Sequence, residues 1–146
     1  MSRTIVMASP LTLPSEPHAE PIPPAWVLSG KPVSRTKLLA RSHDWLANVV
    51  LWECSAGSFN WHYSRDEILF VISGEALIIS TAGEERLLGP GDFAYFPAGT
   101  SCQWRVLQEV KKIAFVRETI WQPLGFCLKV WNKALRVSGL KGKSPL

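Results

Sequence analysis

The chain has 146 residues, of which 47% are hydrophobic and 19% charged, a composition that excludes an intrinsically disordered chain and predicts one globular domain with a buried core. Seven Trp, 11 Pro and 10 Gly favour an all-β body over a helical bundle, because large rings and turn formers are typical of sheet proteins. The net charge of +4 is uneven: residues 1–109 hold 8 Lys or Arg against 11 Asp or Glu, whereas residues 110–146 hold 8 against 1.

Prolines dominate the N-terminal segment, where seven of the 11 lie in the first 32 residues. Each proline lacks a backbone donor and fixes φ, so we predict that residues 1–24 form a Pro-rich arm that is extended or disordered. An open-ended barrel has edge strands that need covering, and an arm exchanged between two copies would cover them. We therefore expect a homodimer.

Short β-rich runs separated by turn signals follow the arm, and we predict a barrel domain over residues 25–118. Strands at this spacing, with no helices between them, indicate a sandwich or a barrel. The turn signals include Ser73-Gly74 and Gly89-Pro90-Gly91-Asp92. The predicted strands are Leu46–Cys54, Phe59–Tyr63, Glu67–Ile72, Glu75–Ser80, Glu84–Leu88, Phe93–Phe96, Cys102–Leu107 and Lys111–Arg117.

The apolar period changes after Arg117, and residues 119–146 are predicted to form an amphipathic helix with a basic tail. The apolar positions follow a helical spacing, at Leu124, Leu128, Trp131 and Leu135. The stripe is short, which favours packing against the barrel over binding to a membrane surface. No nucleic-acid-binding motif accompanies the basic residues, and no apolar run reaches the roughly 18 residues of a membrane-spanning helix. We therefore expect neither a nucleic acid nor a membrane as a partner.

Three cysteines, Cys54, Cys102 and Cys127, have no paired spacing and predict neither a disulfide framework nor a zinc site. Cys54 and Cys127 are interpreted as core residues. The first ten residues contain no apolar stretch long enough for a secretory signal. Together these features indicate a reducing compartment, and we expect a cytoplasmic protein.

Several motifs within residues 26–117 resemble those of the cupins. They are the strand end Trp52-Glu53-Cys54-Ser55-Ala56-Gly57, the segment from Trp61 to Glu67, the turn region Gly91–Thr100, and Trp104. More narrowly, the chain resembles small single-domain cupins related to ureidoglycine aminohydrolase and to the ethanolamine-utilisation cupin. The resemblance implies a cupin-type double-stranded β-helix, a jelly-roll barrel, here with an N-terminal arm and one C-terminal α-helix.

The same resemblance implies where a metal would bind. Metal-binding cupins use His-x-His, a Glu and a further His, and these positions fall on Trp61, Tyr63, Glu67 and Cys102. Only the Glu is retained, so we expect no cofactor. A divalent metal held by Glu67, Cys102 and Tyr63 is the alternative.

Strand alternation predicts which side chains line the barrel. The resemblance implies that Trp61 and Tyr63 take the ligand directions and point inward, and alternation places Cys102 and Trp104 together on one face of the partner strand. With Glu67, these residues form the predicted pocket of Trp61, Tyr63, Glu67, Cys102 and Trp104. The same alternation points His62 outward. A small-molecule ligand is the partner that such an aromatic pocket suits best.

Two pocket residues are candidates for catalysis. A carboxyl enclosed by Trp and Tyr loses hydration, a condition that suits Glu67 to general acid or base catalysis, with Tyr63 assisting. The alternative is that Glu67 accepts structural hydrogen bonds from Tyr63 or from a backbone amide. Cys102 has no His on its face to activate it, which favours an inert buried thiol over a nucleophile.

Three functions remain open at this point. The first is a cupin domain that binds a small polar metabolite in an aromatic barrel pocket. The second is an enzyme, an aminohydrolase, isomerase or related activity, that acts on a small nitrogenous or carbonyl metabolite through Glu67. The third is a structural or interaction protein.

Overall fold

Two long antiparallel strands form the spine of the fold. The computed structural model describes residues 5, 7, 9–12 and 16–140. Strands β6 (Asp66–Ser80) and β9 (Ser101–Arg117) pair along almost their whole length. Because both strands are long, each has room to pair with two shorter strands along its other edge.

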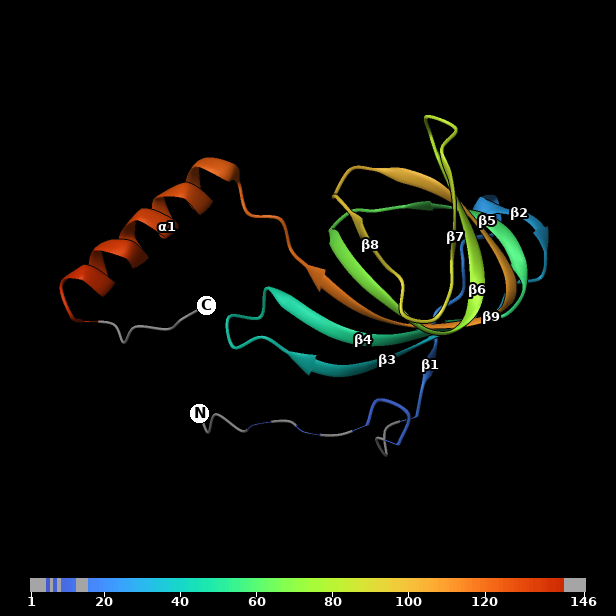
Figure 1. Ribbon diagram of the computed structural model, residues 1–146, viewed down its shortest axis with the longest axis horizontal. Helices are drawn as coiled ribbons and strands as arrows, with labels where there is room; N and C mark the ends of the chain where they lie inside the picture. Colours follow the sequence, from blue (N-terminus) through green and yellow to red (C-terminus); the bar gives the residue numbers. More distant parts are fainter. Residues whose placement is uncertain (1–4, 6, 8, 13–15, 141–146) are drawn as a thin grey trace.

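Shorter strands complete one sheet around this spine. β9 pairs first with β5 (Gly57–His62) and then with β4 (Ala47–Cys54). β6 pairs in the same way with β8 (Phe93–Phe96) and β7 (Glu85–Leu88). The sheet curls around a buried core (Figure 1), which confirms the predicted all-β barrel.

Two predicted pairs of strands are single strands in the structure. Runs 67–72 and 75–80 both belong to β6, and runs 102–107 and 111–117 both belong to β9. At Gly74 the backbone has φ +78°, and the β6–β9 register shifts around this residue. The turn signal at Ser73-Gly74 therefore marks a bulge that bends β6, not the end of a strand.

Three further strands precede β4 and were not predicted. β3 (Ser34–Arg41) pairs with β4, and β2 (Val27–Gly30) pairs with β5. β1 (His18–Ala19) pairs with β3 at the edge of the sheet. The sequence of β3 lacks a regular alternation of apolar and polar residues, which is why pattern analysis missed it.

The last part of the N-terminal arm, residues 16–24, lies against the barrel. Residues 1–4, 6, 8 and 13–15 of the predicted arm lie outside the described residues. From Glu16 onward the chain forms β1, buries Ile22 to 6% exposure, and enters a 3-10 turn, η1 (Pro24–Trp26). This stretch is therefore part of the folded body.

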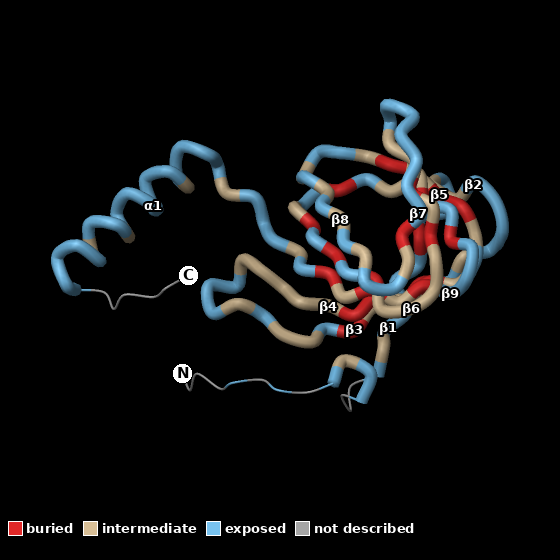
Figure 2. The backbone as a smooth tube through the Cα atoms, viewed as in Figure 1, coloured by how far each residue is buried: buried red, intermediate tan, exposed pale blue. Residues whose placement is uncertain are grey.

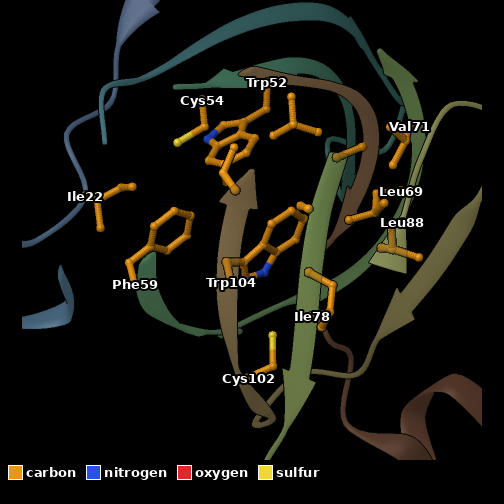
Figure 3. Close-up of a cluster of buried hydrophobic side chains, with 14 of the residues drawn as sticks. Ile22, Trp52, Cys54, Phe59, Leu69, Val71, Ile78, Leu88, Cys102 and Trp104 are labelled. Carbon is orange, nitrogen blue, oxygen red and sulfur yellow. The ribbon is translucent and has the colours of Figure 1, made fainter. Parts of the chain in front are cut away.

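Aromatic residues fill the centre of the barrel. Phe59 and Trp104 are almost fully buried and stack with their ring planes 5° from parallel. Trp52 packs edge-on against both rings. Figure 3 shows these rings gathered between the strands, and Figure 2 shows that most of the buried residues lie in the strands.

The C-terminal helix forms as predicted but does not pack as predicted. α1 (Gln122–Val137) begins with Pro123 in its first turn, yet none of its residues is buried. It stands away from the barrel in Figure 1, and Cys127, expected in the core, is exposed. Packing of α1 against its own barrel was therefore a wrong prediction. Within the described chain no helix is long and apolar enough to cross a membrane.

Candidate functional site

Strand β5 directs alternate side chains into the barrel, as predicted. Phe59 is fully buried and Trp61 is partly buried, whereas His62 is exposed. Tyr63 follows the strand and is also buried, with its backbone N–H donating to the Thr100 carbonyl at 2.9 Å. This bond continues the pairing with the neighbouring chain segment, so the inward direction of Tyr63 is fixed.

The Tyr63 hydroxyl belongs to a buried polar cluster. Trp104 Nε1 donates a hydrogen bond to Tyr63 Oη at 3.0 Å, and the Tyr63 ring stacks on Phe96 at 4.4 Å between centroids. Burial raises the pKa of Tyr63 well above its usual value, and Cys102 adds to this effect. Tyr63 is therefore a neutral phenol near pH 7.

Glu67 forms a buried ion pair that was not predicted. Lys112 Nζ donates to Glu67 Oε1 at 2.5 Å, and only 5% of the Lys112 side chain and 11% of the Glu67 side chain are exposed. The same ammonium lies 4.7 Å from the Trp52 ring centroid and 4.8 Å from that of Trp104. The partner of Glu67 is thus an ammonium, in place of the expected Tyr63 or backbone amide.

A cavity of about 430 Å³ opens beside this ion pair. Trp61, Tyr63 and Glu67 of the predicted pocket line it. The structure differs at Cys102 and Trp104, which contact Tyr63 but do not line the cavity. Other lining residues are Trp26, Thr36, Asn48, Val50, Trp52, His62, Ser64, Arg65, Lys112, Ala114 and Val116.

The N-terminal segment supplies one wall of the cavity. Glu20, Pro21 and Pro23 line it, and Trp26 packs edge-on against Trp61 at 5.6 Å. The segment is held in place by backbone and side-chain hydrogen bonds between Glu20 and Ser34. The prolines that suggested only an arm therefore also shape the site.

Lys112 and Trp52 line the cavity but were not in the predicted pocket, although the sequence contains a signal for them. Lys112 lies on the same face of β9 as Val110, Ala114 and Val116, so it occupies an inward position of an otherwise apolar face. Trp52 occupies the matching position in β4, directly opposite Lys112. A lysine on the apolar face of a strand indicates a buried partner, because an unpaired buried charge is costly.

Burial accounts for the chemistry of two cysteines. It raises the pKa of Cys102 to about 11 and that of Cys54 to about 12. Both are thiols, not thiolates, near neutral pH, which supports the prediction of an inert Cys102. The His62 imidazole pairs with Ser101 Oγ at 2.7 Å and contacts the Trp26 ring.

The residues at the four metal-ligand positions of the cupin motif do not fit a divalent metal. The positions of the three expected imidazoles hold Trp61, Tyr63 and Cys102, and the last two are protonated, which makes them poor ligands. The Lys112 ammonium occupies the remaining carboxylate, Glu67. Among the described residues, no three His, Cys, Asp or Glu side chains come together as a metal-binding group.

Solved structures share this fold at low sequence identity. A candidate ethanolamine utilization protein Q from Salmonella typhimurium LT2 is 20% identical, with 60% of this chain and 72% of that chain covered at a TM-score of 0.53. The Clostridium difficile EutQ protein is 24% identical, with coverages of 66% and 79% and a TM-score of 0.54. A candidate mannose-6-phosphate isomerase from Ralstonia eutropha is 20% identical, with coverages of 64% and 92% and a TM-score of 0.52.

The family is established by the sequence itself. No curated protein matches the sequence. The EutQ-like cupin domain matches residues 42–114, half of the chain, and this match spans β4 to β8 and most of β9. The barrel, the similar structures and the domain match agree, and the chain belongs to the EutQ-like cupin family.

Proposed function

We propose that the chain binds a small polar metabolite with an N–H or O–H donor in the cavity beside Glu67. The observation that carries this proposal is the carboxylate itself. One oxygen of Glu67 accepts from Lys112, and the other makes no hydrogen bond to a described residue although Glu67 lines the cavity. Trp52, a second lining residue, carries the one buried side-chain polar atom among the described residues without a hydrogen-bond partner, its Nε1. A carboxylate oxygen without a protein partner at a cavity is the group that fixes a ligand donor in place.

The walls support a ligand with a flat or apolar body. Trp26 and Trp52 each pack edge-on against Trp61, at 5.6 and 6.0 Å. These contacts hold the three indoles in position, and all three rings line the cavity. A ligand that places a flat or methylated group against these indoles gains apolar and π contacts without reordering them.

The size of the cavity limits the ligand. Its volume of about 430 Å³ lies near the lower end of small-molecule sites, which span roughly 300–1,000 Å³. The Glu67–Lys112 pair contributes no net charge, and Arg65 at the cavity pairs with Glu118 at 3.2 Å. A compact ligand with a donor group fits better than a large polyanion.

An enzyme is the second candidate, and one arrangement favours it. Glu67 and Tyr63 line the same cavity, and Lys112 contacts the carboxylate, so three proton-carrying groups surround one space. Glu67 would act as general acid or base on a nitrogenous or carbonyl metabolite, with the neutral Tyr63 phenol as a hydrogen-bond donor. One structure with this fold is a candidate mannose-6-phosphate isomerase, but at 20% identity the likeness concerns the fold alone.

Ligand-induced shifts of the melting temperature test the proposal. Wild type and Glu67→Gln are screened against amino acids, amino alcohols, amides and hydroxy acids, with binding followed by tryptophan fluorescence. We expect one class to bind, and Glu67→Gln to weaken it roughly tenfold to a hundredfold, as for loss of a charged hydrogen bond. The matched control is Glu53→Gln, because Glu53 pairs with the neighbouring Lys111 at 3.1 Å outside the cavity.

The same screen separates the candidate functions. Conversion of a bound compound, with kcat falling by about a hundredfold or more in Glu67→Gln, would favour the enzyme. Binding that is equally tight in Glu67→Gln would contradict the role given to this carboxylate. If no compound of these classes binds, the proposal fails, and a structural or interaction protein becomes the better interpretation.

A further inference from the structure

The outer face of the barrel carries an exposed apolar stripe. Ile68 and Phe70 of β6 are 42% and 45% exposed, Phe93 and Tyr95 of β8 are 65% and 54%, and Phe115 of β9 is 46%. We call these five residues the outer stripe. Exposed apolar surfaces of this extent on a single chain mark interaction sites.

Strand register makes the outer stripe continuous. Ile68 lies directly opposite both Tyr95 and Phe115, and Phe70 lies opposite Phe93. The Phe70 ring contacts Phe93 at 6.1 Å and Phe115 at 6.3 Å between centroids. Alternate residues of the same strands, such as Glu67 and Leu69, point inward, so the stripe is separate from the cavity.

Helix α1 presents a second apolar face without a partner. Leu124, Leu128 and Trp131 are 50%, 43% and 63% exposed and follow one another at helical spacing. We call these residues, with Leu135, the helix stripe. Lys129 and Lys133 lie on the other side of the helix, so α1 is amphipathic although the described chain covers neither side.

We propose that α1 of one copy packs across the outer stripe of a second copy, and that the exchange is reciprocal. Both apolar faces are then covered by the same contact, made twice. A two-fold arrangement of this kind closes and leaves no stripe exposed. The contact lies on the outside of the barrel, so it does not depend on the proposed ligand site.

The dimensions of the two stripes agree. From Leu124 to Leu135 the helix stripe is roughly 16 Å long, from the rise of an α-helix. The outer stripe crosses three adjacent strands, β8, β6 and β9, and with side chains it spans a similar length, on the order of 15 Å. Five half-exposed large side chains offer roughly 500 Å² of apolar surface. Two reciprocal contacts therefore bury about 2,000 Å², at the upper end of the range for a standard stable interface.

The connection to β9 favours exchange over folding back. Glu118 is held at the barrel by its backbone N–H, which donates to the Leu46 carbonyl at 2.8 Å, and by its ion pair with Arg65. The chain therefore leaves the barrel in a fixed direction, and α1 stands clear of the outer stripe of its own copy (Figure 1). A second copy is the occupant that supplies the missing surface.

The need to cover both stripes favours a second copy over an anionic membrane. The barrel over residues 25–118 has 10 Lys or Arg and 10 Asp or Glu, whereas α1 has three basic residues and no acidic one. An anionic membrane would attract the basic α1, but it would leave the outer stripe uncovered. A second copy covers both stripes.

Light scattering after size-exclusion chromatography of the full chain tests the proposal. Wild type at about 50 µM is expected at twice the 16.3 kDa of one chain. Trp131→Asp in the helix stripe and Phe93→Asp in the outer stripe should each be monomeric, with circular dichroism showing that both remain folded. The controls are Lys129→Gln on the polar side of α1 and Leu107→Asp, an exposed position of β9 outside the stripe, and both should remain dimeric.

Mixing the two monomeric variants gives the decisive result. The intact helix of Phe93→Asp can pack on the intact outer stripe of Trp131→Asp, so the mixture should form a heterodimer through one contact. Failure of the mixture to associate would overturn the proposal, as would a monomeric wild type or a dimer that survives both substitutions. Co-sedimentation of wild type, but not Trp131→Asp, with vesicles of phosphatidylcholine and phosphatidylserine would assign α1 to membranes instead.

Discussion

Lys112 Nζ lies 2.5 Å from Glu67 Oε1 inside the barrel, although 45 residues separate the two in sequence. Neither residue is directly opposite the other across β6 and β9: Glu67 faces Val116, and Lys112 faces Val71. The two long side chains meet because the sheet curls and both point to its inner face. The ion pair is therefore a product of the barrel as a whole.

Removing Lys112 should strongly destabilise the fold. Lys112→Met leaves the buried Glu67 carboxylate without a counter-charge, and breaking a buried pair in this way costs about 3–5 kcal/mol. The free energy of unfolding in urea measures the loss. The double variant Glu67→Gln/Lys112→Met should be more stable than the sum of the two single losses predicts, because it leaves no unpaired charge.

The neighbouring lysine provides the control for this prediction. Lys111 pairs with Glu53 at 3.1 Å on the outer face, with its side chain 33% exposed. Lys111→Met should therefore cost no more than about 1 kcal/mol. Equal losses for the Lys111 and Lys112 variants would contradict the buried ion pair.

Gly74 should not tolerate a side chain. A Cβ at this position would lie 2.0 Å from the Glu109 carbonyl oxygen, and φ of +78° strains any L residue. Gly74→Ala should therefore lower the free energy of unfolding by about 3 kcal/mol or more, because a clash with the backbone of β9 adds to the strain.

A second glycine separates strain from the clash. Gly83 has a similar φ of +83° with no atom within 4 Å of a Cβ. Gly83→Ala should cost only the strain, about 1–2 kcal/mol, measured by the same urea denaturation. If both variants lose the same amount, the close approach of Gly74 to β9 does not exist.

Stability should fall at alkaline pH because of the buried thiols. The pKa of Cys102 rises from its usual 9.0 to about 11 and that of Cys54 to about 12 in the folded chain, through burial. Between pH 9 and 11 the unfolded chain releases these protons while the folded chain keeps them. The stabilisation is thus complete below about pH 9 and is lost as the pH rises, with a slope of about 1.4 kcal/mol per pH unit for each thiol.

Cysteine variants identify the source of this slope. Urea denaturation at pH 8, 9, 10 and 10.5 should show a flatter decline for Cys54→Ala/Cys102→Ala than for wild type. Cys127 is exposed on α1, so Cys127→Ala should keep the wild-type slope. A double variant that declines as steeply as wild type would exclude these two thiols as the cause.

Local patterns predicted the strands and one part of the site. The cupin motif and period-two alternation together placed Trp61 and Tyr63 inside the barrel and His62 on the opposite face of the strand, and the motif ending at Glu67 placed this carboxyl among them. Each of these predictions depends on residues that are close in sequence, for which alternation and spacing are sufficient information. The strand break predicted at Ser73-Gly74 was wrong, because a bulge within a strand uses the same residue types as a turn.

The other part of the site depends on register and curvature. Lys112 and Trp52 enter the site from β9 and β4, and Glu20 and Trp26 enter it from a segment interpreted as an arm. No local pattern states which strand lies opposite another or how far the sheet curls. Cys102 shares an inward face with Trp104, yet both contact Tyr63 and neither lines the cavity.

By itself, the sequence determined an all-β barrel and a C-terminal helix, since alternation and helical spacing are properties of neighbouring residues, and its cupin motif predicted the inward direction of Trp61, Tyr63 and Glu67. Only the tertiary structure decided that Lys112 is the partner of Glu67 and that α1 leaves its apolar face open. An amphipathic pattern predicts that the apolar face of a helix will be covered. Which surface covers it depends on contacts between distant parts of the chain or between chains.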